Sequence, residues 1–100
     1  MNVRFHPIAI VELEEAAQWY EAQRMELREE FLAEFRTGIG QVIELPHAWQ
    51  LVGTGVRRYR LGSFPYGIVY IIEDDQIVVL AVAHLRRKPG YWEPRLQMKR

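Results

Sequence analysis

The sequence has 100 residues, of which 49% are apolar and 26% charged, and its 13 basic side chains balance 13 acidic ones. This composition is typical of one compact soluble domain, and we expect a single domain over residues 1–100. The absence of cysteine excludes disulfides, thiolate metal sites and thiol nucleophiles, while the lack of an apolar run of about 18 residues and of an N-terminal export signal predicts a cytoplasmic protein without a membrane span.

The first half of the chain predicts a strand followed by two helices. Residues 2–6 alternate in polarity and end at Pro7, which favours a short strand and then the first turn of a helix. Apolar side chains recur at helical spacing over residues 8–23 and again from Leu27 to Leu45, and Pro46 ends the pattern. Two amphipathic helices joined this closely predict an antiparallel helical hairpin.

The second half changes to the two-residue period of strands. Residues 46–55 contain a proline and two glycines and are predicted to form a loop. Residues 56–61, 68–73 and 77–83 have strand patterns, separated by a Gly-Ser-Phe-Pro-Tyr-Gly turn and by a pair of aspartates. We therefore predict an α+β fold. The helical hairpin packs on one face of an antiparallel sheet, which consists of this three-strand meander and the N-terminal strand, and a short C-terminal segment follows.

The last strand is apolar on both faces, which predicts a central position with cover on both sides. Strict alternation places Ile77, Val79, Ala81 and Ala83 on one face and Val78, Leu80 and Val82 on the other. The helical hairpin covers only one of these faces. The other face needs the C-terminal segment (residues 91–100), a second subunit or a different protein, and we interpret this need as a sign of a binding partner.

Several kinds of active site are disfavoured by the residues present. The one serine, Ser63, stands outside any Gly-x-Ser-x-Gly motif, which argues against a serine hydrolase. The two aspartates are adjacent and the three histidines are scattered, so no metal site is expected. The glutamates at positions 12, 14, 15 and 21 are interpreted as a solvated helix face rather than a catalytic carboxylate pair.

Basic side chains gather in the second half of the chain. Residues 51–100 carry nine basic and four acidic side chains, a net charge of +5, and residues 1–50 carry four and nine, a net charge of −5. This asymmetry predicts an anionic partner, either nucleic acid or an acidic protein segment, although attraction between the two halves of one fold would also account for it. Alternation places Arg58 and Arg60 on one strand face, about 7 Å apart, where they can grip successive anionic groups or protect an edge strand.

A cluster of cations and aromatic residues follows the last strand. In chain order it contains His84, Arg86, Arg87, Lys88, Tyr91 and Trp92. The cations can bind phosphates while an aromatic ring stacks on a base, or the set can bind a carboxylate-rich peptide. Trp92 is alternatively an anchor that packs back on the sheet. His84 either acts as a general acid or base or only bonds a neighbouring carbonyl.

Two segments carry a resemblance to a known family. They are Arg-Arg-Tyr-Arg-Leu-Gly-Ser-Phe-Pro-Tyr-Gly-Ile-Val-Tyr at 57–70 and Ile-Val-Val-Leu-Ala-Val-Ala-His-Leu-Arg-Arg-Lys-Pro-Gly-Tyr-Trp at 77–92. With the predicted order of elements, and with Phe-His-Pro at 5–7 and Ala-Ala-Gln-Trp-Tyr-Glu at 16–21, the chain resembles the RelE/ParE superfamily of bacterial toxins, often labelled plasmid stabilisation proteins. The resemblance implies the toxin half of a type II toxin-antitoxin pair, without a cofactor. A cognate antitoxin would hold it inactive through a flexible segment that wraps the toxin, which leaves a homodimer or a hetero-oligomer with the antitoxin open.

The superfamily has two activities, and the resemblance implies residues for the first. RelE-like members are metal-independent endoribonucleases that cut mRNA in the ribosome, with cations that stabilise a phosphorane-like state while the 2′-hydroxyl attacks. By position these cations fall on Arg58, Arg60 and Arg87, with His84 as the acid or base candidate. The C-terminal aromatic of such a site falls on Tyr91 or Trp92.

ParE-like members block DNA gyrase instead, and the resemblance is closer to this branch. Ribonuclease members usually carry an arginine after the aromatic that opens the second meander strand, whereas Tyr66 is followed here by Gly67. The Phe-Pro-Tyr turn and the Ala-His-Leu-Arg-Arg ending also look ParE-like. Surfaces for the target or antitoxin are expected at Arg58, Arg60, Arg86, Arg87, Lys88, Tyr91 and Trp92. A degenerate toxin that retains only antitoxin binding is a third interpretation.

Overall fold

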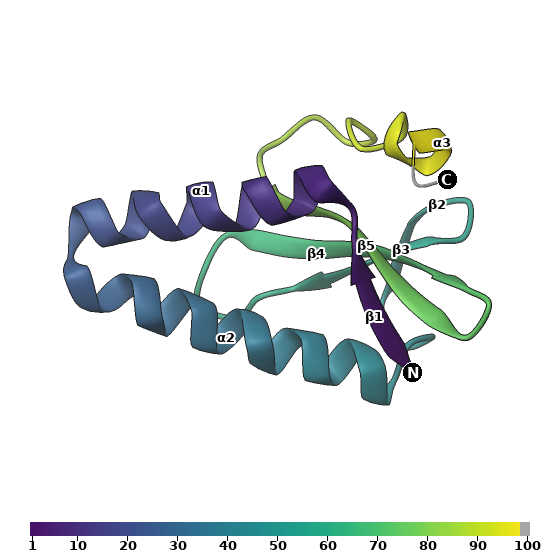
Figure 1. Ribbon diagram of the computed structural model, residues 1–100, viewed down its shortest axis with the longest axis horizontal. Helices are drawn as coiled ribbons and strands as arrows, with labels where there is room; N and C mark the ends of the chain where they lie inside the picture. The colour runs from purple at the N-terminus through teal and green to yellow at the C-terminus, as the bar shows by residue number, and fades with distance from the viewer. Residues whose placement is uncertain (99–100) are drawn as a thin grey trace.

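The computed structural model describes residues 1–98 and has an α+β fold, as the sequence predicts (Figure 1). Its elements are β1 (Asn2–Phe5), α1 (Pro7–Gln23), α2 (Met25–Glu44), β2 (Gln50–Gly53), β3 (Val56–Arg60), β4 (Tyr66–Glu73), β5 (Gln76–His84) and α3 (Arg95–Met98). Lys99 and Arg100, which the charge count includes, lie outside the described residues. None of the helices in residues 1–98 combines the length and the apolar character needed to cross a bilayer.

The strands of residues 1–98 form a five-stranded sheet in the order β1-β5-β4-β3-β2. β3, β4 and β5 are the predicted antiparallel meander. Its last turn is the expected tight reversal, in which Asp74 and Asp75 have φ angles of 50° and 61°, the left-handed region that two-residue hairpin turns use. β1 pairs with β5 in parallel, from Asn2 with Gln76 onward. The sheet is therefore mixed rather than wholly antiparallel, because β1 and β5 are joined by a long crossover instead of a hairpin.

β2 corrects the prediction of a loop over residues 46–55. It pairs antiparallel with β3, and its register shifts between Leu51 and Gly53. The strand is short, interrupted by this irregularity and at the sheet edge, with Leu51 exposed, so it lacks the alternating pattern that predicts a strand. It forms because β3 offers a free edge, which the local sequence does not reveal.

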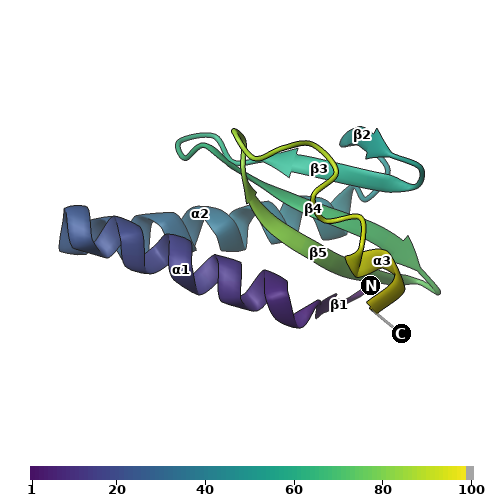
Figure 2. The same cartoon turned by 90° about the horizontal axis from the view of Figure 1, so that it is seen from above.

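α1 and α2 cover one face of the sheet as the predicted antiparallel hairpin (Figures 1 and 2). α1 begins after His6, whose Nδ1 accepts a hydrogen bond from the Ile8 backbone N–H at 3.1 Å and caps the helix. Three buried alanines, at positions 9, 16 and 17, face the core. An aromatic cluster lies in the core on the helix side of the sheet. The rings of Tyr20, Phe31 and Phe64 pack against one another, with centroids 4.8 to 5.3 Å apart in each pair.

β5 is buried on both sides as predicted, but its alternation is interrupted at Leu80. Tyr70 of β4 lies opposite Val79 and Val69 lies opposite Ala81, so Leu80 is the extra residue of a β-bulge. After the bulge Ala81 and Ala83 face away from the helices, and Val82 faces them. The predicted faces of these three residues are wrong, because one extra residue moves every later side chain to the other side of the sheet.

The face opposite the helices is covered by the chain itself. The segment after β5 returns across this face (Figure 2), where Trp92, only 5% exposed, packs with Val56, Val78 and Leu80. Leu96 of α3 packs beside this cluster. Of the three alternatives for this face, the C-terminal segment supplies the cover. The described chain therefore has no bare sheet face that would call for a partner.

The two glycines of α2 offer a matched test of the helix-to-sheet contact. A Cβ at Gly38 would lie 3.0 Å from both Ile68 Cδ1 and Tyr59 Cε1, whereas a Cβ at Gly40 would meet no atom within 4 Å. We expect Gly40→Ala to raise the free energy of unfolding by about 0.5–1 kcal/mol through helix propensity. Gly38→Ala should lower it, because overpacking a core costs about 1–3 kcal/mol. Urea unfolding followed by circular dichroism measures both, and equal gains would contradict the close approach at Gly38.

Candidate functional site

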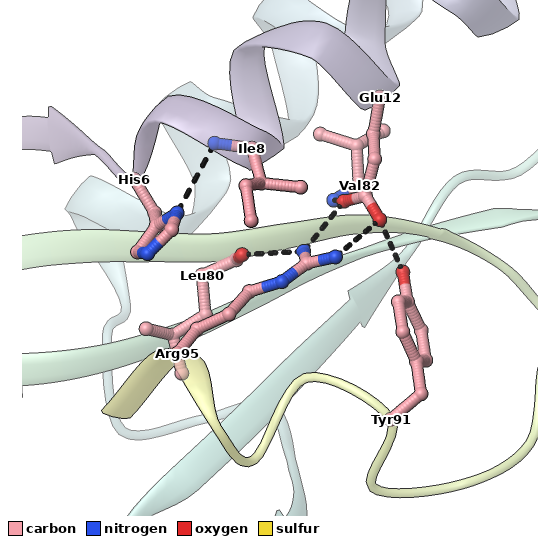
Figure 3. Close-up of polar contacts among 7 residues, drawn as sticks. All are labelled: His6, Ile8, Glu12, Leu80, Val82, Tyr91 and Arg95. Carbon is pink, nitrogen blue, oxygen red and sulfur yellow. Dashed lines mark hydrogen bonds and ion pairs between the residues drawn. The ribbon is translucent and has the colours of Figure 1, made fainter. Parts of the chain in front are cut away.

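A buried ion pair joins α1 to the C-terminal segment. Arg95 Nη1 and Nη2 donate to Glu12 Oε1 and Oε2, each at 2.9 Å (Figure 3). The side chains of Arg95 and Glu12 are only 10% and 12% exposed. A pair this buried needs further hydrogen bonds to offset the loss of hydration, and several are present.

Two of these hydrogen bonds come from the free edge of β5. β1 ends opposite Val79, so β5 continues beyond it without a neighbouring strand on that side. There the Val82 backbone N–H donates to Glu12 Oε1 at 2.9 Å, and the Leu80 carbonyl accepts from Arg95 Nη1 at 2.9 Å. The ion pair thus satisfies backbone groups that a longer β1 would have paired.

Glu12 corrects the interpretation of the α1 glutamates as one solvated row. Glutamates 14, 15 and 21 are exposed as expected, but Glu12 lies on the side of α1 that carries the buried Ala9 and Ala16. A signal for this exists in the sequence, because Glu12 stands three residues after Ala9 and four before Ala16. Its partner Arg95 lies 83 residues further along the chain, and no local pattern connects the two.

Tyr91 links the ion pair to the cation cluster. Its hydroxyl donates to Glu12 Oε2 at 2.9 Å, and burial together with this bond raises the pKa of Tyr91, so the phenol stays a donor. The Arg87 guanidinium lies over the ring, with Cζ 3.8 Å from the ring centroid. Arg95 Cζ lies 5.1 Å from the same centroid. Both distances are in the range of cation–π contacts.

A pocket of about 250 Å³ lies beside this ring, between β2, β3 and the turn after β5. The predicted site residues that line it are Arg58, His84, Arg87, Lys88, Tyr91 and Trp92. Arg60 and Arg86 do not line the pocket. Both are exposed, Arg60 at the end of β3 and Arg86 on the turn after β5. Three cations and no carboxylate line the pocket, so its potential suits an anionic group.

Arg58 lies across Gly67 of β4. A Cβ at position 67 would be 2.8 Å from both Cγ and Cδ of Arg58, so the glycine is what allows this arginine to lie against the strand. Arg58 Nη2 donates to Gln50 Oε1 at 3.1 Å, whereas its Nε is buried without a hydrogen-bond partner in the described chain. Arg60 shares the strand face of Arg58, as the alternation predicts.

His84 and Trp92 are held by contacts within the fold. His84 Nδ1 accepts from the Arg86 backbone N–H at 3.0 Å, and its ring packs edge-on against Tyr66 with centroids 5.1 Å apart. Trp92 is buried near Gly53, whose Cβ would lie 3.0 Å from the indole. This is the anchor position that the sequence left open for Trp92, and it leaves no exposed ring face for stacking on a base.

The chemistry available at this site is electrostatic. Within residues 1–98 no three His, Asp or Glu side chains are grouped so that they could hold a metal ion. The pocket cations can bind an anionic group and stabilise negative charge on it. An acid–base role falls to His84 alone among the side chains that line the pocket, since its neighbours there are cationic, amide or apolar apart from Tyr91.

Comparisons with known proteins match most of this chain. The family described as "ParE toxin of type II toxin-antitoxin system, parDE" matches residues 3–89. A chain of the chromosomal ParDE TA system from P. aeruginosa is similar in structure, with a TM-score of 0.64 and 18% identity over 84% of this chain and 95% of that one. The isolated E. coli RelE toxin has a TM-score of 0.56 and 20% identity, covering 97% of each chain. No curated protein matches the sequence significantly.

Removing the buried carboxylate should cost far more than removing an exposed one. We expect Glu12→Ala to lower the free energy of unfolding by about 3–5 kcal/mol, because it leaves Arg95 buried and uncompensated and the Val82 N–H unpaired. Glu14→Ala is the matched control, since Glu14 pairs with Arg28 on the surface and its side chain is 49% exposed. Urea unfolding compares the two. Losses of similar size would contradict the role assigned to the buried pair.

His6 should make stability depend on pH. Burial, with a smaller contribution from Arg95, lowers the pKa of His6, whereas a histidine in the unfolded chain has a pKa of about 6.5. Below that pH the unfolded chain binds a proton that the folded chain does not, so the free energy of unfolding should fall as the pH drops through about 6.5. His6→Asn keeps a capping acceptor without titrating and should flatten the profile, whereas the exposed His47→Asn should not. Urea unfolding across this range tests it, and a wild-type profile in His6→Asn would refute it.

Proposed function

The chain belongs to the family of ParE toxins of type II toxin-antitoxin systems, and we propose that it arrests growth by disabling DNA gyrase until a cognate antitoxin neutralises it. The family match over residues 3–89 is the observation that carries this proposal, because ParE-like members are the gyrase-directed branch of the superfamily. The action is a protein–protein contact in the cytoplasm and needs no cofactor.

The target surface in this proposal is the turn that follows β5. Arg86, Arg87 and Lys88 are consecutive and exposed, and the Arg87 guanidinium lies over the face of the Tyr91 ring. Adjacent cations on a turn fixed at both ends suit an acidic protein surface, since complementary charge speeds the encounter and sets the register of the contact. Arg58 and Arg60 extend the basic character to β3.

The antitoxin would act as a second protein partner on another part of the surface. α1 leaves three large apolar side chains more than half exposed: Ile10 at 54%, Val11 at 53% and Trp19 at 58%. Ile10 and Trp19 are nine residues apart and so lie on opposite sides of the helix, which suits a partner segment that passes around α1 rather than one that lies on a single face. A flexible antitoxin segment that wraps the toxin would bury them in a hetero-oligomer.

An mRNA endoribonuclease of the RelE kind is the second candidate, and one observation favours it. Arg58, Arg87 and His84 line the same pocket, where the cations would stabilise a phosphorane-like state and His84 would move the proton. Three features weigh against it: Gly67 brings no cation from β4, Arg60 lies outside the pocket, and the Trp92 ring is buried. A degenerate toxin would retain antitoxin binding with neither activity.

Induced production without an antitoxin distinguishes these activities. The gyrase proposal predicts growth arrest with relaxed plasmid DNA or broken chromosomes, measured on chloroquine gels and by pulsed-field electrophoresis. The ribonuclease alternative predicts new cuts in toeprints of translating ribosomes and unchanged supercoiling. Harmless overproduction of folded protein, checked by circular dichroism, would support the degenerate toxin and contradict both.

Replacing the exposed cations should relieve the arrest. We expect the double variant Arg86→Ala/Arg87→Ala to bind the target more weakly, by roughly tenfold for every 1.4 kcal/mol of binding free energy that the arginines contribute. Growth should then be restored at the same expression level. Arg36→Ala, which removes an exposed cation from α2, should remain as toxic as the wild type. Colony counts after induction, with protein levels from immunoblots, give the result. If the double variant is as toxic as the wild type, these arginines are not part of the contact with the target.

A further inference from the structure

Arg87 is held at the site by an aromatic ring rather than by a polar partner. Its guanidinium makes no hydrogen bond or ion pair within residues 1–98, and its Cζ lies 3.8 Å from the centroid of the Tyr91 ring. The residue is otherwise exposed. An exposed arginine without such a contact samples many rotamers, so the position of this guanidinium depends on where the ring lies.

The Tyr91 ring packs beside the buried cluster that contains Trp92, and its hydroxyl is bonded to Glu12. In Figure 3 the ring rises from the C-terminal segment toward α1, and its hydroxyl donates to Glu12 Oε2 at 2.9 Å. Glu12 is itself fixed by the two Arg95 bonds and the Val82 N–H. The Tyr91 backbone N–H adds only a long bond, of 3.3 Å, to the Lys88 carbonyl. The hydroxyl is therefore the ring's one short polar bond to the rest of the fold.

We propose that Glu12 is a positioning residue of the toxin's site, which acts through Tyr91 to hold the Arg87 guanidinium ready for an anionic group of the target. This rests on the proposed function in one respect, namely that Arg87 contacts the target. Arg87 lines both the 250 Å³ pocket and a second hollow of about 200 Å³ beside Trp19 and Tyr66. Its donors are unpaired there, and a side chain fixed before binding loses less entropy on binding.

The family match over residues 3–89 includes Glu12 and Arg87 but not Tyr91 or Arg95. A purely structural role for Glu12 is the competing explanation, since its ion pair also holds the fold together. Tyr91→Phe separates the two roles. It removes only the hydroxyl and leaves the Glu12–Arg95 pair intact, so a structural role predicts no change at Arg87.

The experiment measures the Arg87 side chain directly and toxicity in parallel. A proton over an aromatic ring is shielded, so the Nε–H resonance of wild-type Arg87, assigned with Arg87→Ala, should lie upfield of that of exposed Arg36. In Tyr91→Phe it should move toward the Arg36 position, and toxicity should fall by roughly tenfold. Tyr59→Phe is the matched control, because it removes a phenol hydroxyl on the helix-facing side of β3, and it should change neither readout. Glu12→Ala removes the acceptor of the Tyr91 hydroxyl altogether and should reproduce the Tyr91→Phe shift. Glu12→Ala combined with Tyr91→Phe should then produce no further shift.

The outcomes separate this inference from the proposed function. An Arg87 resonance that stays upfield in Tyr91→Phe, with toxicity unchanged, would overturn the positioning role of Glu12. If Glu12→Ala fails to fold, Tyr91→Phe alone decides the question, because its Glu12 is native. If Arg87→Ala is as toxic as the wild type while Tyr91→Phe still moves the resonance, Glu12 positions the arginine and the proposed contact with the target is wrong.

Discussion

The structure depends on how the edge of β5 is completed where β1 stops. A buried strand edge with unpaired N–H and C=O groups is costly, and β1 pairs with only part of β5. Glu12 and Arg95 close the remainder by bonding the Val82 N–H and the Leu80 carbonyl. Because the pair also bonds internally and to Tyr91, its carboxylate accepts four hydrogen bonds, which is the condition under which a buried ion pair is tolerated. One interaction therefore joins the first helix, the central strand and the C-terminal segment.

The same interaction explains why the candidate site lies where it does. The bulge at Leu80 turns Ala81 and Ala83 toward the face that Trp92 covers, and the chain leaves β5 at His84 with both ends of the following segment fixed. Arg87 and Lys88 are thereby carried to the rim of a pocket whose other wall is Arg58 on β3. The basic surface is thus built on rigid elements rather than on a free tail, which favours specific recognition of an anionic partner.

The sequence predicted what short-range periodicity encodes and missed what depends on distant contacts. Helical spacing located α1 and α2, and the change to a two-residue period located β3, β4 and β5. β2 was missed because it forms against the free edge of β3, and the faces after Leu80 were wrong because a bulge leaves no mark in an apolar run. Of the site, the cations were found by their clustering. The Glu12–Arg95 pair was not, because its members are 83 residues apart, and a glutamate on a helix usually faces solvent.

The parallel pairing of β1 with β5 has a consequence for synthesis. Asn2 pairs with Gln76, so at the usual roughly 5–20 residues per second β1 waits about 4–15 s for its partner strand to be translated. The helical hairpin has local contacts and can fold in that interval, but the pocket cannot exist until β5 and the segment beyond it have emerged. The pocket and its basic rim therefore form last in synthesis, several seconds after the residues of the helical hairpin have been made.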